Sequence, residues 1–252
     1  MDVNEILARF DRDVRQRPQE GPGAVVEREP GVVRVVAGDD GWTGITWSGL
    51  DGLDADAVIA AQVRRFAVAG MPWEWKLYSH DAPPDLAARL LAAGFEPGPP
   101  ESLLVAEVAA LPRRPELPAG VRLEPVTGPE GAELLVRVHD EVFGGDHSAV
   151  GRAVLARPDE VKAVVAMAGD RPICAGRLEL HPGTEFAGLW GGGTAADWRG
   201  RGVFRAVVAY RAAQAAAAGY RYLQVDASDD SRPILRRLGF TRLATTTPYV
   251  HA

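Results

Sequence analysis

The sequence is poor in cysteine and contains no long apolar run. Cys174 is the only cysteine in 252 residues, so an intramolecular disulfide is excluded and the paired-cysteine spacings of zinc sites are absent. Cys174 lies in the apolar run PICAGRLEL, and we interpret it as a buried structural thiol. No segment reaches the roughly 18 apolar residues of a membrane helix, and the charged N-terminal stretch does not resemble a signal peptide. We therefore predict a cytoplasmic protein with no membrane association and no metal site.

The net charge of −6 is unevenly distributed along the chain. Up to Pro112 there are 10 basic and 18 acidic residues, whereas the remainder has 18 basic and 16 acidic residues. An anionic ligand is therefore expected in the second half. Neither half is basic enough for a general nucleic-acid-binding protein, so we predict no nucleic-acid partner.

A proline-rich segment divides the chain. The sequence LPRRPELPAG, residues 111–120, has three prolines in seven positions and no hydrophobic period, which is typical of a semi-rigid linker. We predict one domain over residues 1–111, a linker over residues 112–118 and a second domain over residues 119–252.

The second domain is predicted to mix strands and helices. The tight turn GDRP, residues 169–172, suits a hairpin between the strand patterns at residues 161–169 and 171–180. Strand patterns occur at residues 121–126, 161–169, 171–180, 185–194, 220–228 and 242–250, and helical patterns occur at residues 129–144, 148–160, 203–219 and 231–240.

The end of the first domain has a similar order of elements. A helix at residues 54–70 is followed by a strand at 72–80, a helix at 83–95 and a strand at 101–108. The pairs Gly94-Phe95 and Gly239-Phe240 close corresponding short helices 145 residues apart. We interpret this as a tandem repeat of one fold, with a chance match of two common patterns as the alternative.

The loop RGRG, residues 199–202, precedes the long helix of the second domain. The N–H groups at a helix start lack intrahelical partners and, with the helix dipole, form a site for phosphate oxygens. Gly200 and Gly202 let the backbone approach a bulky anion, and Arg199, Arg201 and Arg205 would add charge-assisted contacts. The first domain has SGLDGLDADA before its long helix, so we expect it to have lost such a site.

Three consecutive glycines, Gly191, Gly192 and Gly193, interrupt the strand before this loop. Glycine within a strand commonly marks a bulge or a close approach of another backbone or ligand. A bulge would turn main-chain N–H groups toward a ligand carbonyl and separate this strand from its neighbour. An extended, amide-bearing group such as a pantetheine arm could pair with the open edge.

The strand, the R-G-R-G-V-F helix entrance, the strand YLQVDAS and the helix ending in RRLGF together resemble the GNAT N-acyltransferase superfamily. Its pyrophosphate signature, Arg/Gln-x-x-Gly-x-Gly/Ala, is matched by Arg199 and Gly202, whereas Phe204 departs from it. The resemblance covers roughly residues 121–250, and the first domain resembles a degenerate copy. It implies an α/β fold with a mixed, mostly antiparallel central sheet flanked by helices, in tandem.

The resemblance further implies acetyl-CoA as the acyl-donor cosubstrate. The glycine-rich strand would hold the pantetheine arm and the thioester carbonyl, and the loop would hold the pyrophosphate. Ser231 would contact the cofactor or only cap its own helix. The predicted cofactor-binding residues are Gly192, Gly193, Thr194, Arg199, Gly200, Arg201, Gly202, Val203, Phe204, Arg205 and Ser231.

The usual catalytic side chains of the superfamily are absent from their usual places. Leu235 stands where a tyrosine acid is often found, and Gly188 stands where a glutamate is often found. Deprotonation of an attacking amine still requires a proton acceptor. We predict the strand-end carboxylates Glu185 and Asp226 for catalysis, with Glu179 as a further candidate.

His139 and His147 lie in the region that covers acyl acceptors in this fold, with a surface or capping role as the alternative. The predicted function is transfer of an acetyl group from acetyl-CoA to a primary amine of a small molecule or peptide, by direct attack in a ternary complex. The alternatives are a module that binds acyl-CoA without turnover and an interaction protein that binds no cofactor. We expect a monomer or a homodimer.

Overall fold

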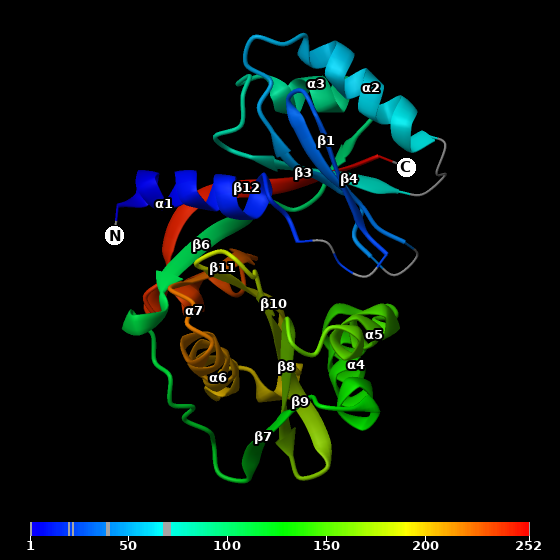
Figure 1. The fold of residues 1–252 in the computed structure, drawn as a ribbon. Coiled ribbons are helices and arrows are strands. Elements are labelled where there is room, and N and C mark those ends of the chain that lie inside the picture. The colour runs from blue at the N-terminus through cyan, green and yellow to red at the C-terminus, as the bar shows by residue number, and fades with distance from the viewer. Residues whose placement is uncertain (1, 20, 22, 39–40, 68–71, 252) are drawn as a thin grey trace. The chain divides into compact units, whose positions relative to one another are not determined.

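The computed structural model describes residues 2–19, 21, 23–38, 41–67 and 72–251. The chain forms two compact units (Figure 1). The first contains residues 1–103, 226–229 and 242–252, and the second contains residues 104–225 and 230–241. The C-terminal strand therefore lies in the first unit, far along the sequence from its neighbours there. The predicted domain boundaries, at residues 1–111 and 119–252, and the functions expected of the two domains stay predictions.

The first unit contains a sheet with strand order β1-β2-β3-β4-β12. The pairs β1–β2, β2–β3 and β4–β12 are antiparallel, and β3–β4 is parallel. A parallel pair requires a crossover, and the helix α2 supplies it. The elements are α1 (Val3–Phe10), η1 (Asp11–Arg15), β1 (Val25–Glu29), β2 (Val32–Val36), β3 (Gly44–Ser48), α2 (Ala55–Ala67), β4 (Trp73–Tyr78), α3 (Leu86–Ala92), β5 (Glu96–Pro97) and β12 (Thr241–His251).

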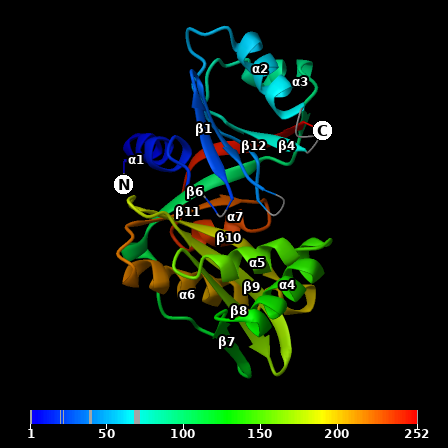
Figure 2. The same ribbon diagram turned by 45° about the vertical axis from the view of Figure 1, so that its right-hand side comes forward.

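The second unit contains a sheet with strand order β7-β8-β9-β10-β11. Its first three pairs are antiparallel and β10–β11 is parallel, with α6 as the crossover helix. Helices α4 and α5 cover one face of this sheet and α6 covers the other (Figures 1 and 2). The elements are η2 (Val108–Ala110), β7 (Val121–Pro125), α4 (Pro129–Phe143), α5 (Ser148–Ala156), β8 (Val161–Ala168), β9 (Arg171–Leu180), β10 (Phe186–Thr194), η3 (Ala196–Trp198), α6 (Val203–Ala217), β11 (Tyr222–Ala227) and α7 (Arg232–Arg237). The strand β6 (Glu101–Glu107) is divided between the two units.

The two units repeat one topology. In each, an antiparallel meander ends in a strand, a crossover helix and a parallel strand, namely β3–α2–β4 and β10–α6–β11. A short helix follows each time, α3 and then α7, and each ends at a left-handed glycine, Gly94 with φ +91° and Gly239 with φ +109°. Both glycines precede a buried phenylalanine, Phe95 or Phe240. The predicted tandem α/β fold is confirmed.

The helices and strands predicted for the second domain are present within a few residues of their expected ends. Ala168 and Arg171 are paired at the end of the hairpin β8–β9, so the turn begins at Gly169, which has φ +59°. In the first domain, α2 covers most of the predicted helix 54–70, whose expected end at Gly70 lies outside the described residues. None of the described helices is long and apolar enough to cross a membrane.

Each unit has its own apolar core. In the first unit, Trp75, Phe66 and Phe95 pack between the sheet and α2 and α3. In the second unit one cluster lies under α4 and α5, around Leu135 and Val165. The other cluster lies under α6, where Val203 and Val207 pack on Cys174 and its neighbours. The first two turns of α6 are therefore packed against β8 and β9.

Candidate functional site

The edge of β10 is open along its second half. Parallel pairing between β10 and β11 is limited to three residue pairs, from Phe186–Tyr222 to Gly188–Gln224. β10 itself continues to Thr194, and Trp190, Gly191 and Gly192 are only partly buried. The edge of β10 beyond Gly188 is therefore not paired with β11, and its use by an extended ligand stays a prediction.

The glycine triplet forms an irregularity in β10. The register against β9 shifts between Trp190 and Gly193, which is the position of a β-bulge. Gly191 has φ +57°, a conformation that other residues rarely adopt. The carbonyl oxygen of Gly191 lies 2.9 Å from Nε2 of His139 on α4. That imidazole donates from Nε2, because a carbonyl oxygen can only accept, and its Nδ1 carries the lone pair.

His139 is held in its neutral form. It is 1% exposed, and burial lowers its pKa to about 4, although the hydrogen bond to Gly191 acts in the opposite direction. The nearby cation Arg177 lowers the pKa further. The bulge carbonyl is thus fixed by an uncharged donor at neutral pH, and the backbone orientation of the triplet depends on α4.

The other two glycines of the triplet face opposite sides of the sheet. A Cβ atom on Gly193 would lie 2.8 Å from Val142 and 2.9 Å from the Phe143 ring, both on α4. A Cβ atom on Gly192 would lie 3.0 Å from the Phe204 ring on α6. These approaches give a packing reason for both glycines, alongside their predicted role toward a thioester. Their assignment as cofactor residues stays a prediction.

Thr194 ends β10 and is 8% exposed. Its hydroxyl donates to the sulfur of Cys174 at 3.1 Å. Cys174 is fully buried and burial raises its pKa to about 11, so the thiol is not activated at neutral pH. The interpretation of Cys174 as a structural thiol is confirmed.

The entrance of α6 has an uncapped helix start. Gly202, the residue before the helix, has φ +84°, and Gly200 has φ +75°. No side chain caps the helix. The first backbone hydrogen bond of the helix is donated by Ala206 to the Gly202 carbonyl. Among the residues that the structure describes, nothing accepts from the N–H groups of Val203 to Arg205, which leaves them for an anion.

The arginines of this loop have no carboxylate partner within the described chain. Arg199 donates from Nε to the Thr194 carbonyl at 3.2 Å, which ties the loop to the end of β10. The guanidinium of Arg201 lies 4.8 Å above the Trp198 ring, a cation–π contact. Arg199, Arg201 and Arg205 are exposed. The loop therefore presents three cations beside open N–H groups.

The α4 side of the sheet carries an imidazole–carboxylate pair that the sequence did not reveal. Asp140 accepts from the backbone N–H of His147 at 2.9 Å and lies 3.0 Å from its Nδ1. The pair leaves Nε2 of His147 without a described partner, and the His147 side chain is 26% exposed. The rings of His147 and His139 are 5.6 Å apart. Asp140 follows His139 directly in the sequence, but its pairing depends on the turn at 144–147.

The space at Gly188 is occupied by neighbouring side chains. A Cβ atom there would lie 2.5 Å from Trp190 Nε1 and 2.6 Å from Gln224 Nε2, on the same side of the sheet as α4. The Gln224 side chain is buried, and its Oε1 has no described hydrogen-bond partner. Glu179 is engaged by Arg177 at 2.8 Å. A glutamate could not replace Gly188 here without moving Gln224.

The two carboxylates predicted for catalysis lie elsewhere. Glu185 precedes β10, at the end opposite the bulge, and lies 3.5 Å from Arg221. Seven residues of extended chain separate Glu185 from Gly192, a distance of about 23 Å. Asp226 belongs to the first unit, is 2% exposed and is paired with Lys76 at 2.5 Å. The structure does not bring Glu185 to the bulge, and it pairs Asp226 with a lysine of the first unit.

Ser231 stands at the start of α7, and its side chain makes no capping hydrogen bond to that helix. Its backbone carbonyl accepts from Ile234 and Leu235, which are the first turn of the helix. The capping role that the sequence suggested for its hydroxyl is thus not observed. Its assignment to the cofactor stays a prediction.

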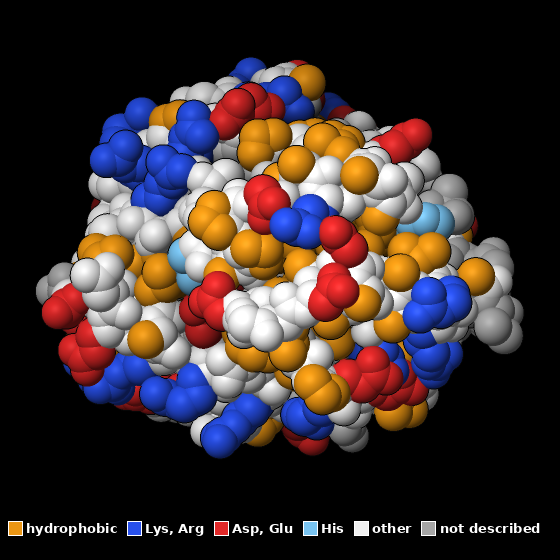
Figure 3. All heavy atoms as spheres, turned by 90° about the horizontal axis from the view of Figure 1, so that it is seen from above, with side chains coloured by type: hydrophobic (Ala, Val, Ile, Leu, Met, Phe, Trp, Pro, Cys, Tyr) orange, Lys and Arg blue, Asp and Glu red, His pale blue; other side chains and the backbone are white. Residues whose placement is uncertain are grey.

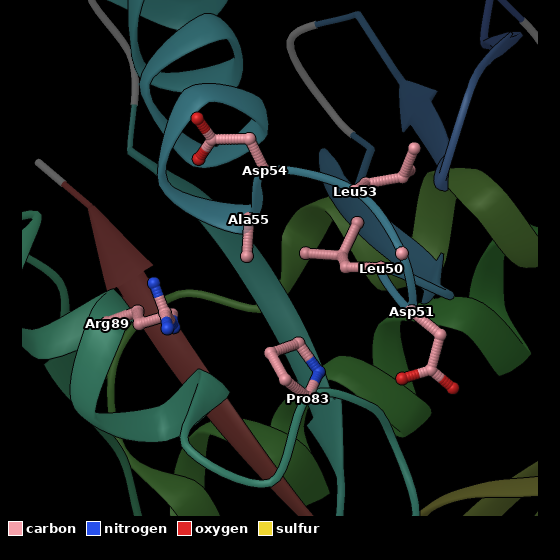
Figure 4. Close-up of a pocket in the computed structure, with 8 residues that line it drawn as sticks. Leu50, Asp51, Leu53, Asp54, Ala55, Pro83 and Arg89 are labelled. Carbon is pink, nitrogen blue, oxygen red and sulfur yellow. The ribbon is translucent and has the colours of Figure 1, made fainter.

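The corresponding entrance of α2 in the first unit is built from acidic residues. The side chain of Asp54 accepts from the N–H of Ala57 at 3.1 Å, so the helix start is capped by its own chain. Asp51 and Asp54 lie on the loop around a hollow of about 330 Å³, with Arg89 of α3 on its rim (Figure 4). Arg89 is itself paired with Asp56 and Asp85, at 2.7 and 2.9 Å.

The arrangement of the whole chain matches solved structures of one fold. A GCN5-related N-acetyltransferase from Kribbella flavida aligns with a TM-score of 0.72 and 21% identity, over 99% of this chain and 95% of that chain. A tandem GNAT protein from the clavulanic acid biosynthesis pathway aligns with a TM-score of 0.61 and 13% identity, over 92% and 84%. A GCN5-related N-acetyltransferase from Sphaerobacter thermophilus aligns with a TM-score of 0.64 and 12% identity, over 98% and 84%. No protein-family model and no curated protein matches the sequence.

Proposed function

We propose that this chain, which has the GNAT fold in two copies, is an acyl-CoA-dependent N-acyltransferase whose second copy binds the donor. The observation that carries the proposal is the entrance of α6. Its first-turn N–H groups are open, two glycines clear the approach, and three exposed arginines surround it. The entrance of α6 follows β10, whose edge beyond Gly188 is not paired with β11. A phosphate at the helix and an acyl group at the strand would therefore belong to one ligand.

The pyrophosphate would be bound by the N–H groups of residues 203–205, because the helix dipole and the unsatisfied donors both favour negative charge. Arg199 and Arg201 would add charge-assisted hydrogen bonds. The pantetheine amides would pair with the β10 edge beyond Gly188, where β11 no longer does. Acetyl-CoA would be the simplest donor for this arrangement.

The reaction is an attack of a neutral amine nitrogen on the thioester carbonyl. The carbon–nitrogen bond forms, the carbon–sulfur bond breaks, and the amine proton must be removed. Main-chain N–H groups at the bulge would stabilise the oxyanion. His139 holds the carbonyl of Gly191, so it also orients the N–H group on the opposite side of the same peptide bond. The departing thiolate takes its proton from water.

We propose that Nε2 of His147 accepts the proton that the attacking amine loses. Asp140 accepts from Nδ1–H of this imidazole, which fixes the tautomer that has its lone pair on Nε2. His147 lies on the α4 side of the sheet, opposite the helix that would hold the phosphates. A primary amine would therefore approach from the α4 side and give its proton to His147 in a ternary complex.

The experiment measures release of free thiol from acetyl-CoA in the presence of a broad panel of amines. Wild-type protein should release thiol with at least one amine, and His147→Gln should reduce the rate by about 100-fold, the effect of losing a general base. His80→Gln is the matched control, because His80 is 27% exposed and lies 2.8 Å from the carboxylate of Asp11 in the first unit. Equal rates for the two variants would contradict the assignment of His147.

A second candidate function is supported by Leu235 and Gly188, which replace side chains that the superfamily often uses. This candidate is a module that binds acyl-CoA without turnover. It predicts tight binding of acetyl-CoA with no amine-dependent thiol release in any member of the panel. Binding without release would therefore favour the module over the enzyme.

A further inference from the structure

Arg211 on α6 is a buried cation without an anionic partner. The residue is 2% exposed, and no carboxylate among the described residues lies within 4 Å of its guanidinium. Of its neighbours, the Cys174 thiol raises the pKa of Arg211 but is uncharged at neutral pH, and Arg177 lowers this pKa because it has the same sign. Burial lowers the pKa of Arg211 to about 10, a value at which it is still charged at neutral pH. A guanidinium that is buried without compensation is costly to the fold.

The other buried arginines of the chain are compensated. Arg15, also 2% exposed, donates to both carboxylate oxygens of Asp81 at 2.7 and 2.8 Å. Arg34, 4% exposed, is paired with Glu27 and Glu29. Since the first unit supplies carboxylates to its buried arginines, their absence around Arg211 is a feature of this position.

Two glycines make room for the Arg211 guanidinium. A Cβ atom on Gly176 of β9 would lie 2.8 Å from its Cζ and Nη1, and one on Gly192 of β10 would lie 3.4 Å from its Nη2. The guanidinium therefore lies against the glycine triplet, beside the ring of Phe204. Any side chain at Gly176 would displace it.

The hydrogen bonds of Arg211 use only part of its donors. Nε donates to the Val207 carbonyl at 3.2 Å, and Nη1 donates to the carbonyls of Arg177 and Trp190 at 3.1 and 3.4 Å. Within the described chain Nη2 has no acceptor. The three carbonyl oxygens account for a hydrogen-bond donor at position 211. Because they carry no net charge, the neutral amide of a glutamine could donate to them without the cost of desolvating a cation.

We propose that Arg211 binds the free carboxylate of a dicarboxylic acyl group, so that the donor is a malonyl- or succinyl-type acyl-CoA. The inference rests on the proposed function and specifies its donor. The Trp190 carbonyl that Nη1 contacts belongs to the bulge at which the thioester would lie. A carboxylate one or two methylenes beyond the thioester carbonyl would reach Nη2 from there. It would supply the missing negative charge and leave the α4 side free for the amine.

The position of the guanidinium separates this role from binding of the CoA phosphates. The open N–H groups for the pyrophosphate are at residues 203–205, in the first turn of α6. The Nε of Arg211 is held one turn farther along the helix, at the Val207 carbonyl, and the ring of Phe204 lies beside the guanidinium at Gly192. The acyl end of the donor is therefore the part that meets Arg211.

The experiment compares the affinities of wild-type protein for CoA, acetyl-CoA and succinyl-CoA by calorimetry. A charge-assisted hydrogen bond that also neutralises a buried cation should make succinyl-CoA bind about 10- to 100-fold more tightly than acetyl-CoA. In Arg211→Gln that preference should disappear, with the affinity for acetyl-CoA within about 2-fold of wild type. Arg211→Lys, which keeps the charge, should retain part of the preference.

Equal affinity of wild-type protein for acetyl-CoA and succinyl-CoA would overturn the inference while leaving the proposed function in place. An equal loss of affinity for all three ligands in Arg211→Gln would place the contact on the body of CoA and would also overturn it. Absence of binding by any of the three would remove the proposed function itself. The comparison in wild-type protein decides the inference even if Arg211→Gln fails to fold.

Discussion

The two crossover helices begin in opposite ways. At α2 the loop is acidic, and Asp54 occupies the helix start with its own carboxylate. At α6 the preceding residue is Gly202, nothing caps the helix, and arginines surround it. Because the fold around the two helices is the same, the fold alone does not create an anion site. Under the proposed function, a few residues at the helix entrance would decide which copy binds a phosphate.

The two units also differ in how they use charge. In the first unit the buried cations Arg15 and Arg34 and the partly buried Lys76 all have carboxylate partners at 2.5 to 2.7 Å. Acidic side chains lie next to basic ones at the centre of the face in Figure 3. In the second unit Arg211 and the arginines of the loop 199–205 have no such partner among the described residues. These cations of the first copy are therefore paired, and under the proposed function the four unpaired arginines of the second copy would keep their charge for a ligand.

The largest expected effect is the difference between two buried arginines, Arg15 in the first unit and Arg211 in the second. Arg15→Met would leave the buried carboxylate of Asp81 unpaired and should lower the free energy of unfolding by about 3–5 kcal/mol. Arg211→Met removes an uncompensated charge and leaves only carbonyls behind, so its cost should be about 1 kcal/mol or less. Urea unfolding of the two variants at neutral pH measures both. Similar losses would show that the charges of the two units are used alike.

The second prediction concerns the strand before each helix. β10 has the glycine triplet and its bond to His139, whereas β3 has Ile45 to Ser48 at the corresponding place. The pKa of His139 is about 4 in the folded chain and near 6.5 when unfolded, so the unfolded state takes up this proton first as the pH falls. The contribution of neutral His139 to the free energy of unfolding is complete above pH 6.5, and about 3 kcal/mol of it is lost as the pH falls to 4.

His139→Gln keeps an N–H donor for the Gly191 carbonyl but cannot titrate. The loss of stability between pH 7 and pH 4 should therefore be about 3 kcal/mol smaller in this variant than in wild-type protein, as measured by urea unfolding. If both proteins lost the same amount of stability, His139 would not be the buried neutral donor described for the bulge.

The smallest expected effect is at the capped helix. Asp54→Ala removes the acceptor for Ala57 N–H and should lower the free energy of unfolding by about 1 kcal/mol, while Asp54→Asn should lose less. Neither variant should change acetyl-CoA affinity, because the first copy is not expected to bind it. A change in affinity in Asp54→Ala would place a ligand at the α2 entrance and break the contrast between the copies.

Much of the fold could be predicted because local patterns and tertiary contacts agree. The helical spacing of Val203, Ala206 and Val207 and the stop near Gly219 define α6, and the same residues pack on β8 and β9. The strands β1 to β3 were not predicted, because their short runs lie among charged residues and glycines. Nor did the pattern of β12 reveal that it belongs to the first unit, since pairing partners are set by register with β4 and not by the strand's own composition.

The site was predictable where a backbone conformation demanded a residue type. Gly200 and Gly202 were identified from a motif, and both have the positive φ that favours glycine. The side chains to which we assign a chemical role were harder to identify, because tertiary contacts define their environments. Arg211 looks in sequence like any helical arginine, and only Gly176 and Gly192, from two strands, make its burial possible.

Under the proposed function, one acyl-CoA binds per chain, at the entrance of α6. The most direct measurement is calorimetric titration of acetyl-CoA into ligand-free wild-type protein, Gly202→Glu and Gly52→Glu. The two glycines are matched, with φ +84° before α6 and φ +75° before α2. Wild-type protein and Gly52→Glu should bind one equivalent at micromolar affinity, and Gly202→Glu should bind at least about 100-fold more weakly because a carboxylate replaces the phosphate. Two equivalents per chain, or equal affinity in the two variants, would contradict the claim.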